Sequence, residues 1–407
     1  MTGIAIFAVT YLLIAVQRLP LVHLNRPAAS LLGAVAMVGF GVITVEEAYA
    51  AVDMDVLVFL LGLMLIVGYL EVGRFFEWAA AKVLERIRSP LQLLFAVVVG
   101  GGLMSAFFVN DTVCLVMTPV LLLTLRRLGE RPQPYLIALA MGSNVGSVLS
   151  ITGNPQNMLI GIWSGASFSG FLLDMLPVAA GGLAVTFLCL RWAYRAVLRD
   201  RFEQPPHPET VVMDRSLVYR ALALFAVAVV GWMAGGSLPV VAITCGAVMV
   251  AVAQRDPAYA IERVDWDLLL MFAALFVVMR GLESTGATDW MNRKALALAG
   301  GGSPAEVGIA ASAAMLLLSN LISNVPAVML WRNVVPALPE PDLMWRFIAM
   351  SSTFAGNFLL IGSVANLIVA ERAEAYGVRL SFGEYARVGV PVTLLTMAWG
   401  IAVLLLK

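Results

Sequence analysis

Residues 105–112 read SAFFVNDT and residues 319–326 read SNLISNVP, so an Asn interrupts an otherwise apolar segment in each half of the chain. Each of these stretches is followed by further polar blocks. They are SNVG at 143–146 and TGNPQN at 152–157 in the first half, and GNFL at 356–359 and GSVAN at 362–366 in the second. The same kind of block therefore occurs twice, in the same order.

The spacing of these blocks indicates an internal repeat. The step from Asn110 to Asn144 is 34 residues, and the step from Asn324 to Asn357 is 33 residues. The next steps, to Asn157 and to Asn366, differ by about one helical turn. Polar blocks rich in Gly and Pro, repeated within apolar segments, are typical of secondary transporters built from two inverted halves.

Composition places the chain in a membrane. Of the 407 residues, 61% are hydrophobic and 13% are charged, and the mean hydropathy is +0.90. These values exclude an ordinary soluble domain. Apolar stretches that approach the roughly 20 residues needed to cross a bilayer recur along the whole chain. We therefore predict an all-α polytopic membrane protein of two inverted repeats, each with about five transmembrane helices, a re-entrant hairpin and a broken helix.

The hydrophilic segment at 199–215 falls halfway along the chain and is the predicted cytoplasmic linker. It separates a first repeat, 1–198, from a second repeat, 216–407. Polar irregular backbone at membrane depth is tolerated only where protein or a cavity surrounds it. The Asn motifs therefore predict hairpins at about 90–125 and 303–336, and broken helices at about 135–162 and 343–370.

The distribution of basic residues predicts the topology. With ten spans and two hairpins, 20 of the 26 Lys and Arg residues fall on one face, which the positive-inside rule makes cytoplasmic. Both termini are then outside, and the two hairpins enter from opposite faces. The parity also holds if each hairpin is two complete spans, but the Asn motifs favour the re-entrant version.

Other matches extend the repeat to the starts of spans. Residues 52–57 read VDMDVL and residues 264–269 read VDWDLL. The acidic residues in both stretches stand where a span begins, and there we expect them to cap the helix and complement its dipole.

Sequence motifs of other function classes are absent. No His-Glu-x-x-His, phosphate loop, nucleotide fingerprint or catalytic triad occurs, which argues against an ATP-driven pump or a membrane enzyme. Cys114, Cys189 and Cys245 have no metal-ligand spacing, and we expect them to be packing residues. No cofactor is predicted. The expected partners are membrane lipid and a small solute, and not nucleic acid.

Polar side chains inside apolar segments need partners or a function. One interpretation is structural, because Asn, Gly and Pro break helices and neighbouring side chains satisfy the exposed backbone. The other is functional, because broken helices offer amide groups to an anion and carbonyl groups to a cation. We predict a central site with Asn110, Asp111, Thr112, Ser143, Asn144, Thr152, Gly153, Asn154 and Asn157 on one side and Ser323, Asn324, Thr353, Asn357, Gly362, Ser363 and Asn366 on the other.

Asp111 is the one acidic residue within these motifs, and its counterpart in the second half is Val325. It is a candidate for binding the coupling proton or cation, and equally a cap for the second arm of the hairpin. The coupling ion is expected to be Na⁺ or H⁺. Asn110, Ser143, Asn144 and Asn324 are the candidate Na⁺ ligands.

At these motifs the chain resembles the ion transporter superfamily, which includes arsenite permeases, sodium/proton antiporters and divalent anion:sodium symporters. The marks are GNPQN at 153–157, SNVPAV at 323–328 and the run from Gly356 to Asn366. The dicarboxylate symporters have Ser-Asn-Thr in both hairpins, whereas this chain has VNDT at 109–112 and SNV at 323–325. The Asn-Asp pair is more similar to the arsenite permeases.

The resemblance implies an ion-coupled secondary active transporter of a small anion or oxyanion, in the inner membrane of a bacterium. Each half would contribute a scaffold part and a transport part, and the transport part would move like an elevator in a homodimer. A sodium/proton antiporter and a sodium-coupled dicarboxylate symporter are the alternatives that the resemblance leaves open.

Overall fold

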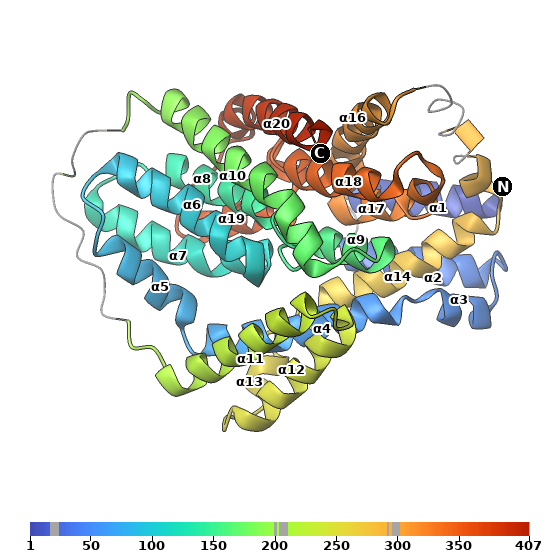
Figure 1. Cartoon of the computed structure of the whole chain (residues 1–407), viewed down its shortest axis with the longest axis horizontal. Coiled ribbons are helices and arrows are strands. Elements are labelled where there is room, and N and C mark those ends of the chain that lie inside the picture. The colour runs from blue at the N-terminus through green and yellow to red at the C-terminus, as the bar shows by residue number, and fades with distance from the viewer. Residues whose placement is uncertain (17–23, 199–201, 203–210, 291–292, 295–301, 407) are drawn as a thin grey trace.

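The computed structural model describes residues 1–16, 24–198, 202, 211–290, 293–294 and 302–406. All regular structure within these ranges is helical. Most of the predicted linker at 199–215 lies outside them, as do Arg18, Arg199, Arg201 and Lys407 of the charge count. Figure 1 shows the arrangement of the helices.

The helices of the first half differ in length, from 7 residues to 26. They are α1 (Thr2–Val16), α2 (Arg26–Gly39), α3 (Val45–Ala51), α4 (Met54–Val72), α5 (Phe75–Leu84), α6 (Pro90–Phe108), α7 (Asn110–Leu128), α8 (Gln133–Ser147), α9 (Pro155–Ser164) and α10 (Phe168–Ala193). Helix α2 ends at Gly39. Gly41 then turns the chain with a φ of 69°, and Thr44 starts α3 with a capping box.

The second half repeats this order of elements. Its helices are α11 (Arg215–Met233), α12 (Leu238–Val252), α13 (Ala258–Ile261), α14 (Trp266–Glu283), α16 (Pro304–Ile322), α17 (Asn324–Trp331), α18 (Pro341–Ala355), α19 (Val364–Ala375) and α20 (Phe382–Leu405), with short 3₁₀ turns at Val335–Ala337 and Leu360–Gly362. The aspartates at the span starts act as expected, because Asp53 caps α4 and Asp265 caps α14 through their side chains.

Within the described residues, six helices are long and apolar enough to cross a membrane, namely α4, α6, α10, α11, α16 and α20. Three shorter apolar helices, α1, α2 and α12, accompany them. A chain with this many apolar helices is a polytopic membrane protein, as its composition predicted.

The Asn motifs stand where helices are interrupted. Val109 separates α6 from α7 with a φ of 63°, and Ser323 separates α16 from α17 with a φ of 77°. Positive φ is unfavourable for a β-branched residue such as Val109, so packing must hold that junction. The two arms of each helix pair contact one another, which gives two helical hairpins with Asn110 and Asn324 directly after their tips.

The two other interruptions follow α8 and α18. Residues 148–154 join α8 to α9, and Asn154 accepts a hydrogen bond from the Asn157 amide as the α9 cap. Pro155 occupies the first helical position, where its missing N–H leaves no further donor unsatisfied. Residues 356–363 join α18 to α19 in the same way, with Ser363 at the cap position.

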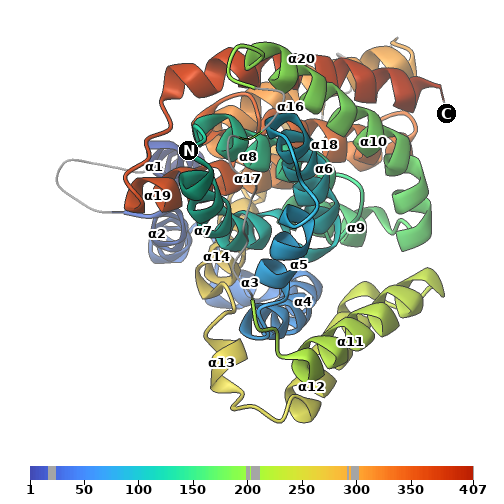
Figure 2. The same cartoon turned by 90° about the vertical axis from the view of Figure 1, so that its left-hand side faces the viewer.

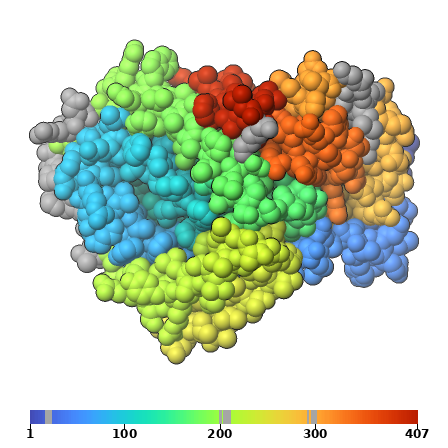
Figure 3. All heavy atoms as spheres, in the orientation of Figure 1, coloured from blue at the N-terminus to red at the C-terminus, as the bar shows by residue number. Residues whose placement is uncertain are grey.

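The two halves interlock. Helix α4 of the first half packs on α12 of the second half, and α14 of the second half packs on α2 of the first half. Helices α11, α12 and α13 lie with α4 on one side of the molecule in both ribbon views (Figures 1 and 2), and α11 contacts α6 and α10 through Phe225 and Trp232. The α11–α12 pair forms the lower edge of the space-filling view (Figure 3). The interrupted helices therefore belong to one body and the α11–α13 segment to its flank.

Candidate functional site

Asn144, near the end of the buried helix α8, is the centre of a hydrogen-bonded network that joins the two halves. Its Oδ1 accepts from Asn110 Nδ2 at 3.0 Å and from Ser363 Oγ at 3.1 Å. Its Nδ2 donates to Asn357 Oδ1 at 2.9 Å and to Asn366 Oδ1 at 3.0 Å. All five residues are at most 4% exposed. We call these five residues the Asn144 network.

A second group of bonds lies beside it, around Asn154. Asn154 Nδ2 donates to Ser147 Oγ at 2.8 Å and to Thr353 Oγ1 at 3.2 Å, so it too bridges the halves. Ser147 Oγ in turn donates to the Asn144 carbonyl at 2.8 Å. The predicted residues Asn154 and Thr353 are therefore brought together with the Asn144 network.

Hydrogen bonds define which residues of the two halves are equivalent. Asn157 Nδ2 donates to the carbonyl oxygens ten and seven residues before it, and Asn366 Nδ2 does the same. Both stand at the third position of their helices. This match pairs Asn157 with Asn366.

The contacts between the halves obey the same relation. With Asn154 paired to Ser363 and Asn144 paired to Thr353, the Asn154 to Thr353 bond becomes equivalent to the Ser363 to Asn144 bond. Asn144 and Asn157 are then 13 residues apart, like Thr353 and Asn366. The structural partner of Asn144 is thus Thr353. Asn357, with which sequence spacing aligns Asn144, is displaced by one helical turn.

At the tip of the first hairpin, backbone and side chains meet the break in α8 and α9. The Asn110 amide donates to the Gly153 carbonyl at 3.0 Å, and Ser143 Oγ donates to the Asn110 carbonyl at 3.2 Å. A Cβ at Gly153 would lie 2.0 Å from the Ser147 carbonyl oxygen, so only glycine fits.

At the tip of the second hairpin, Asn324 lies against the other break. A Cβ built on Gly356 would be 3.2 Å from Asn324 Nδ2. Asn320 Nδ2, on the first arm, donates to the Ala355 carbonyl at 3.0 Å. Gly362 is tightly placed as well, because its Cβ would lie 2.8 Å from Asn320 Oδ1. Each hairpin tip therefore touches the broken helix of its own half.

Four predicted residues lie at the margin of this arrangement. Asp111 and Thr112 are half-buried in the first turn of α7. Arg26 and Asp265 are the charged groups that act on Asp111 through space. Thr152 Oγ1 bonds to Ser150 Oγ at 2.9 Å, and Ser323 forms the hairpin tip itself.

Sequence reasoning missed three serines that complete the site. Ser105 Oγ bonds to Ser143 Oγ at 2.6 Å, Ser147 links Asn144 with Asn154, and Ser150 donates to the Ala106 carbonyl. The signal was available, because all three fall within or beside the motifs that contain the chosen residues.

The chemistry of the site is that of amides, hydroxyls and helix ends. Among the described residues, all buried polar side chains are uncharged, and no group of three or more His, Cys, Asp and Glu could hold a metal ion. Asn110 Oδ1, Asn157 Oδ1 and Asn320 Oδ1 are buried acceptors without a hydrogen-bond partner in the described chain. A solute or cation is expected to satisfy such acceptors, because each costs about 1–3 kcal/mol when left unpaired.

Comparisons with known proteins agree with a transport role. The family described as "Citrate transporter" matches residues 11–346. The chain is 30% identical to the silicon efflux transporter LSI3 of Oryza sativa, over 98% of this chain and 96% of that protein. It is 23% identical to the putative transporter arsB of Dictyostelium discoideum, over 97% and 89%.

The YdaH transporter of Alcanivorax borkumensis has a similar fold, with a TM-score of 0.60 at 14% identity and coverage of 100% of this chain and 98% of that one. Together with the family match and the relatives, this likeness shows that the chain is a multi-pass membrane transporter that belongs to the citrate transporter family.

Proposed function

We propose that the chain is an ion-coupled secondary active transporter that exports a small uncharged or anionic oxo-species, in the manner of an arsenite permease. The observation that carries this proposal is the Asn144 network, in which uncharged side chains from both halves meet at three helix interruptions. The named functions of the relatives, silicon efflux and an arsB-type transporter, support the same solute class.

The donors and acceptors of this network suit a hydroxylated solute. Amides and hydroxyls both donate and accept, so they can exchange hydrogen bonds with an O–H-rich solute without burying a full charge. Helices α7, α9, α17 and α19 all begin at the site, and the positive ends of their dipoles favour oxygen atoms and partial negative charge.

Two coupling schemes are open to experiment. In the first, Na⁺ binds near Asn110, Ser143, Asn144 and Asn324, and the unpartnered Asn110 Oδ1 supports it. Sodium takes oxygen ligands, and unwound carbonyls at a helix break supply them. In the second, Asp111 carries a proton. Its position at the start of α7, as the one acidic residue within the motifs, supports that role.

The proposed movement separates the chain into two parts. Helices α1–α4 and α11–α14 form the scaffold part, and the hairpins and broken helices form the transport part, which moves like an elevator within a homodimer. The halves have inverted orientations, the termini lie outside, and the linker lies in the cytoplasm of a bacterial cell. The repeated order of elements and the equivalent hydrogen bonds of the two halves support this arrangement.

A sodium-coupled dicarboxylate symporter is the second candidate. The family description, "Citrate transporter", favours it, and so do the converging helix N-termini. The uncharged side chains argue for the oxo-species instead, because a dicarboxylate would bring two charges to a site without a buried Arg or Lys in the described chain.

Transport into proteoliposomes tests these alternatives. Silicic acid, arsenite, succinate and citrate are supplied in turn, with an imposed Na⁺ or pH gradient. We expect silicic acid or arsenite to be moved and Asn110→Ala with Asn324→Ala to abolish the movement. Uptake of only the carboxylates would select the second candidate, and Na⁺-dependent proton movement without any solute would select an antiporter.

A further inference from the structure

A cavity of about 350 Å³ lies beside α3. Figure 1 shows α3 at the right-hand end and α5 at the left-hand end. Polar side chains from four elements line the cavity, among them Glu47, Trp163, Arg280, Glu283, Arg332 and Asn333. We call it the mouth cavity. None of its lining residues belongs to the Asn144 network.

Two short helices connect the mouth cavity with the Asn144 network. Helix α9 begins after Asn154 and ends beside Trp163, and α17 begins at Asn324 and ends beside Arg332. These helices contact one another. At 1.5 Å per residue they are about 15 Å and about 12 Å long. The cavity is therefore one short helix away from the site, because α9 and α17 begin at the site and end at the cavity.

Arg332 lies beside the cavity and joins the proposed scaffold part to the proposed transport part. Its guanidinium lies 3.5 Å from the Asp53 carboxylate and 5.0 Å from the Trp163 ring centre. Trp163 Nε1 donates to the same carboxylate at 3.0 Å. Asp53 caps the scaffold helix α4, whereas Trp163 and Arg332 belong to the transport part. A cation held between a carboxylate and an indole face is favourable where water is scarce.

The other charges of the cavity are one guanidinium and two carboxylates. Arg280 lies 3.6 Å from Glu47 and 3.6 Å from Glu283, and Asn333 Nδ2 donates to Glu283. This excess of carboxylates disfavours an anionic ligand, whereas an uncharged hydroxylated solute can hydrogen bond to the group as it stands. Apolar side chains of Phe276, Met279 and Met329 complete the lining.

We propose that the mouth cavity is a second, weaker binding site for the uncharged hydroxylated solute on its outer path, and that Arg332 gates the passage from this site to the Asn144 network. The solute class rests on the proposed function, whereas the gate does not. When the transport part moves relative to α4, the contacts of Arg332 and Trp163 with Asp53 must break, and the passage opens.

The gate is tested by thiol labelling, in a background whose three cysteines are replaced by alanine. Val325→Cys places a thiol beside Asn324, where the native side chain is 6% exposed. We expect a membrane-impermeant maleimide added outside to label it at least 10-fold faster with Arg332→Ala or Asp53→Asn, and to an intermediate extent with Arg332→Lys. Lys82→Gln, which removes an exposed ion pair on α5, is the control and leaves the rate unchanged.

An unchanged labelling rate in both Arg332→Ala and Asp53→Asn would overturn the gate. If Arg332→Ala does not fold, Asp53→Asn breaks the same contact from the scaffold side and decides the question. Labelling from the inner side alone would overturn the outward placement of the cavity.

The binding site is tested with silicic acid, because arsenite reacts with thiols. We expect silicic acid to slow the labelling of Asn333→Cys saturably, at concentrations above those that saturate transport. Transport of silicic acid without any protection of this thiol would overturn the second site and leave the proposed function intact. Faster labelling of Val325→Cys in the gate variants, without transport of any tested solute, would uphold the gate and overturn the proposed function.

Discussion

The two halves contribute unequally to the site, although their elements correspond. In the first half, side-chain hydrogen bonds between the hairpin and its broken helix include Ser105 with Ser143 and Asn110 with Asn144. In the second half, Ser319, the counterpart of Ser105, has a buried hydroxyl without a partner in the described chain. The second arm also differs, because α7 has 19 residues and α17 has 8.

The two halves share the backbone arrangement of their broken helices but differ in the side chains at the site. The equivalent bonds made by Asn157 and Asn366 to backbone carbonyls hold the two broken helices in one geometry. Thr353 stands where the first half has Asn144, and the extra amide of Asn357 fills the space beside it. The Ser105 to Ser143 bond of the first half thus has no equivalent at Ser319 in the described chain, and the second-half hairpin has the shorter second arm.

The largest effect is expected from Asn144→Ala compared with Thr353→Ala. Asn144→Ala removes four side-chain bonds and leaves buried partners unsatisfied, at about 1–3 kcal/mol each, whereas Thr353→Ala removes one bond to Asn154. We predict at least a 100-fold loss of transport rate for Asn144→Ala and about a 10-fold loss for Thr353→Ala, measured in proteoliposomes. Equal losses would contradict the inequality of the halves.

A smaller effect is expected from alanine at the matched glycines Gly153 and Gly362. At Gly153 the new Cβ would meet a backbone carbonyl at 2.0 Å, which cannot move without shifting α8. At Gly362 it would meet the side-chain oxygen of Asn320 at 2.8 Å, which can rotate. We predict that Gly153→Ala destabilises the protein by about 3 kcal/mol and Gly362→Ala by about 1 kcal/mol, measured by thermal unfolding in detergent. The reverse order would contradict this account.

The sequence predicted these positions with differing success, for physical reasons. Asn and Gly in apolar segments have few uses other than a helix break, so Val109, Asn154 and Ser323 were placed at or beside interruptions correctly. The equivalence of Asn144 with Thr353 was not predictable from spacing. The shorter α17 and its connection to α18 change the count of residues between motifs, and only the hydrogen bonds restore the register. The role of Ser147 as a bridge depends on the path of residues 148–154, which spacing does not specify.

A third comparison concerns Asp111 and its counterpart Val325. If Asp111 carries the coupling proton, Asp111→Asn is predicted to reduce pH-gradient-driven transport about 10-fold and to leave Na⁺-driven transport unchanged. Val325→Asn, at the matched position, is expected to affect both equally or neither. The measurement is the initial rate of solute movement under each imposed gradient. Loss of both rates with Asp111→Asn would assign Asp111 to the structure of the α7 start instead.

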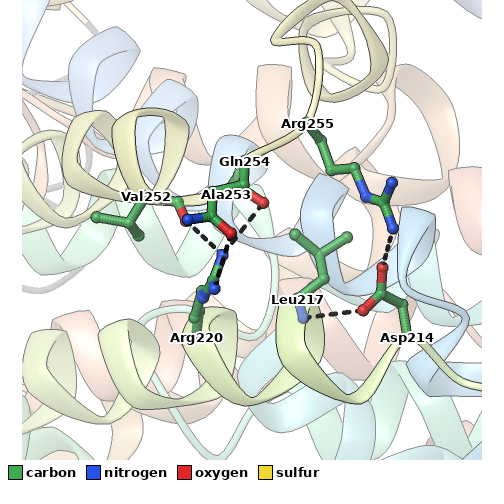
Figure 4. Close-up of polar contacts among 7 residues, drawn as sticks. All are labelled: Asp214, Leu217, Arg220, Val252, Ala253, Gln254 and Arg255. Atoms are coloured by element: carbon green, nitrogen blue, oxygen red, sulfur yellow. Dashed lines mark hydrogen bonds and ion pairs between the residues drawn. The ribbon is translucent and has the colours of Figure 1, made fainter.

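The smallest effect is expected where the second half begins, far from the site. Asp214 caps α11 and pairs with Arg255 at 2.6 Å, while Arg220 donates to the carbonyl oxygens of Val252 and Ala253 at the end of α12 (Figure 4). The hydrogen bond from Arg255 lowers the pKa of Asp214 below its ordinary value. This pair ties α11 to the segment after α12 and reaches neither hairpin.

A carboxylate with a lowered native pKa contributes stability above its ordinary pKa of about 3.9, and that contribution is lost as the pH falls through the native value. Both partners are partly exposed, so Arg255→Gln should cost less than about 1 kcal/mol at pH 7. The difference from the native chain should shrink below pH 4 and at high salt. Gln254→Ala is the control, since it removes an uncharged hydrogen-bond acceptor of Arg220 and changes no charge near Asp214. A pH-independent loss for Arg255→Gln would show that the Arg255 side chain stabilises this corner by packing, and the charge on Asp214 would then have no part in it.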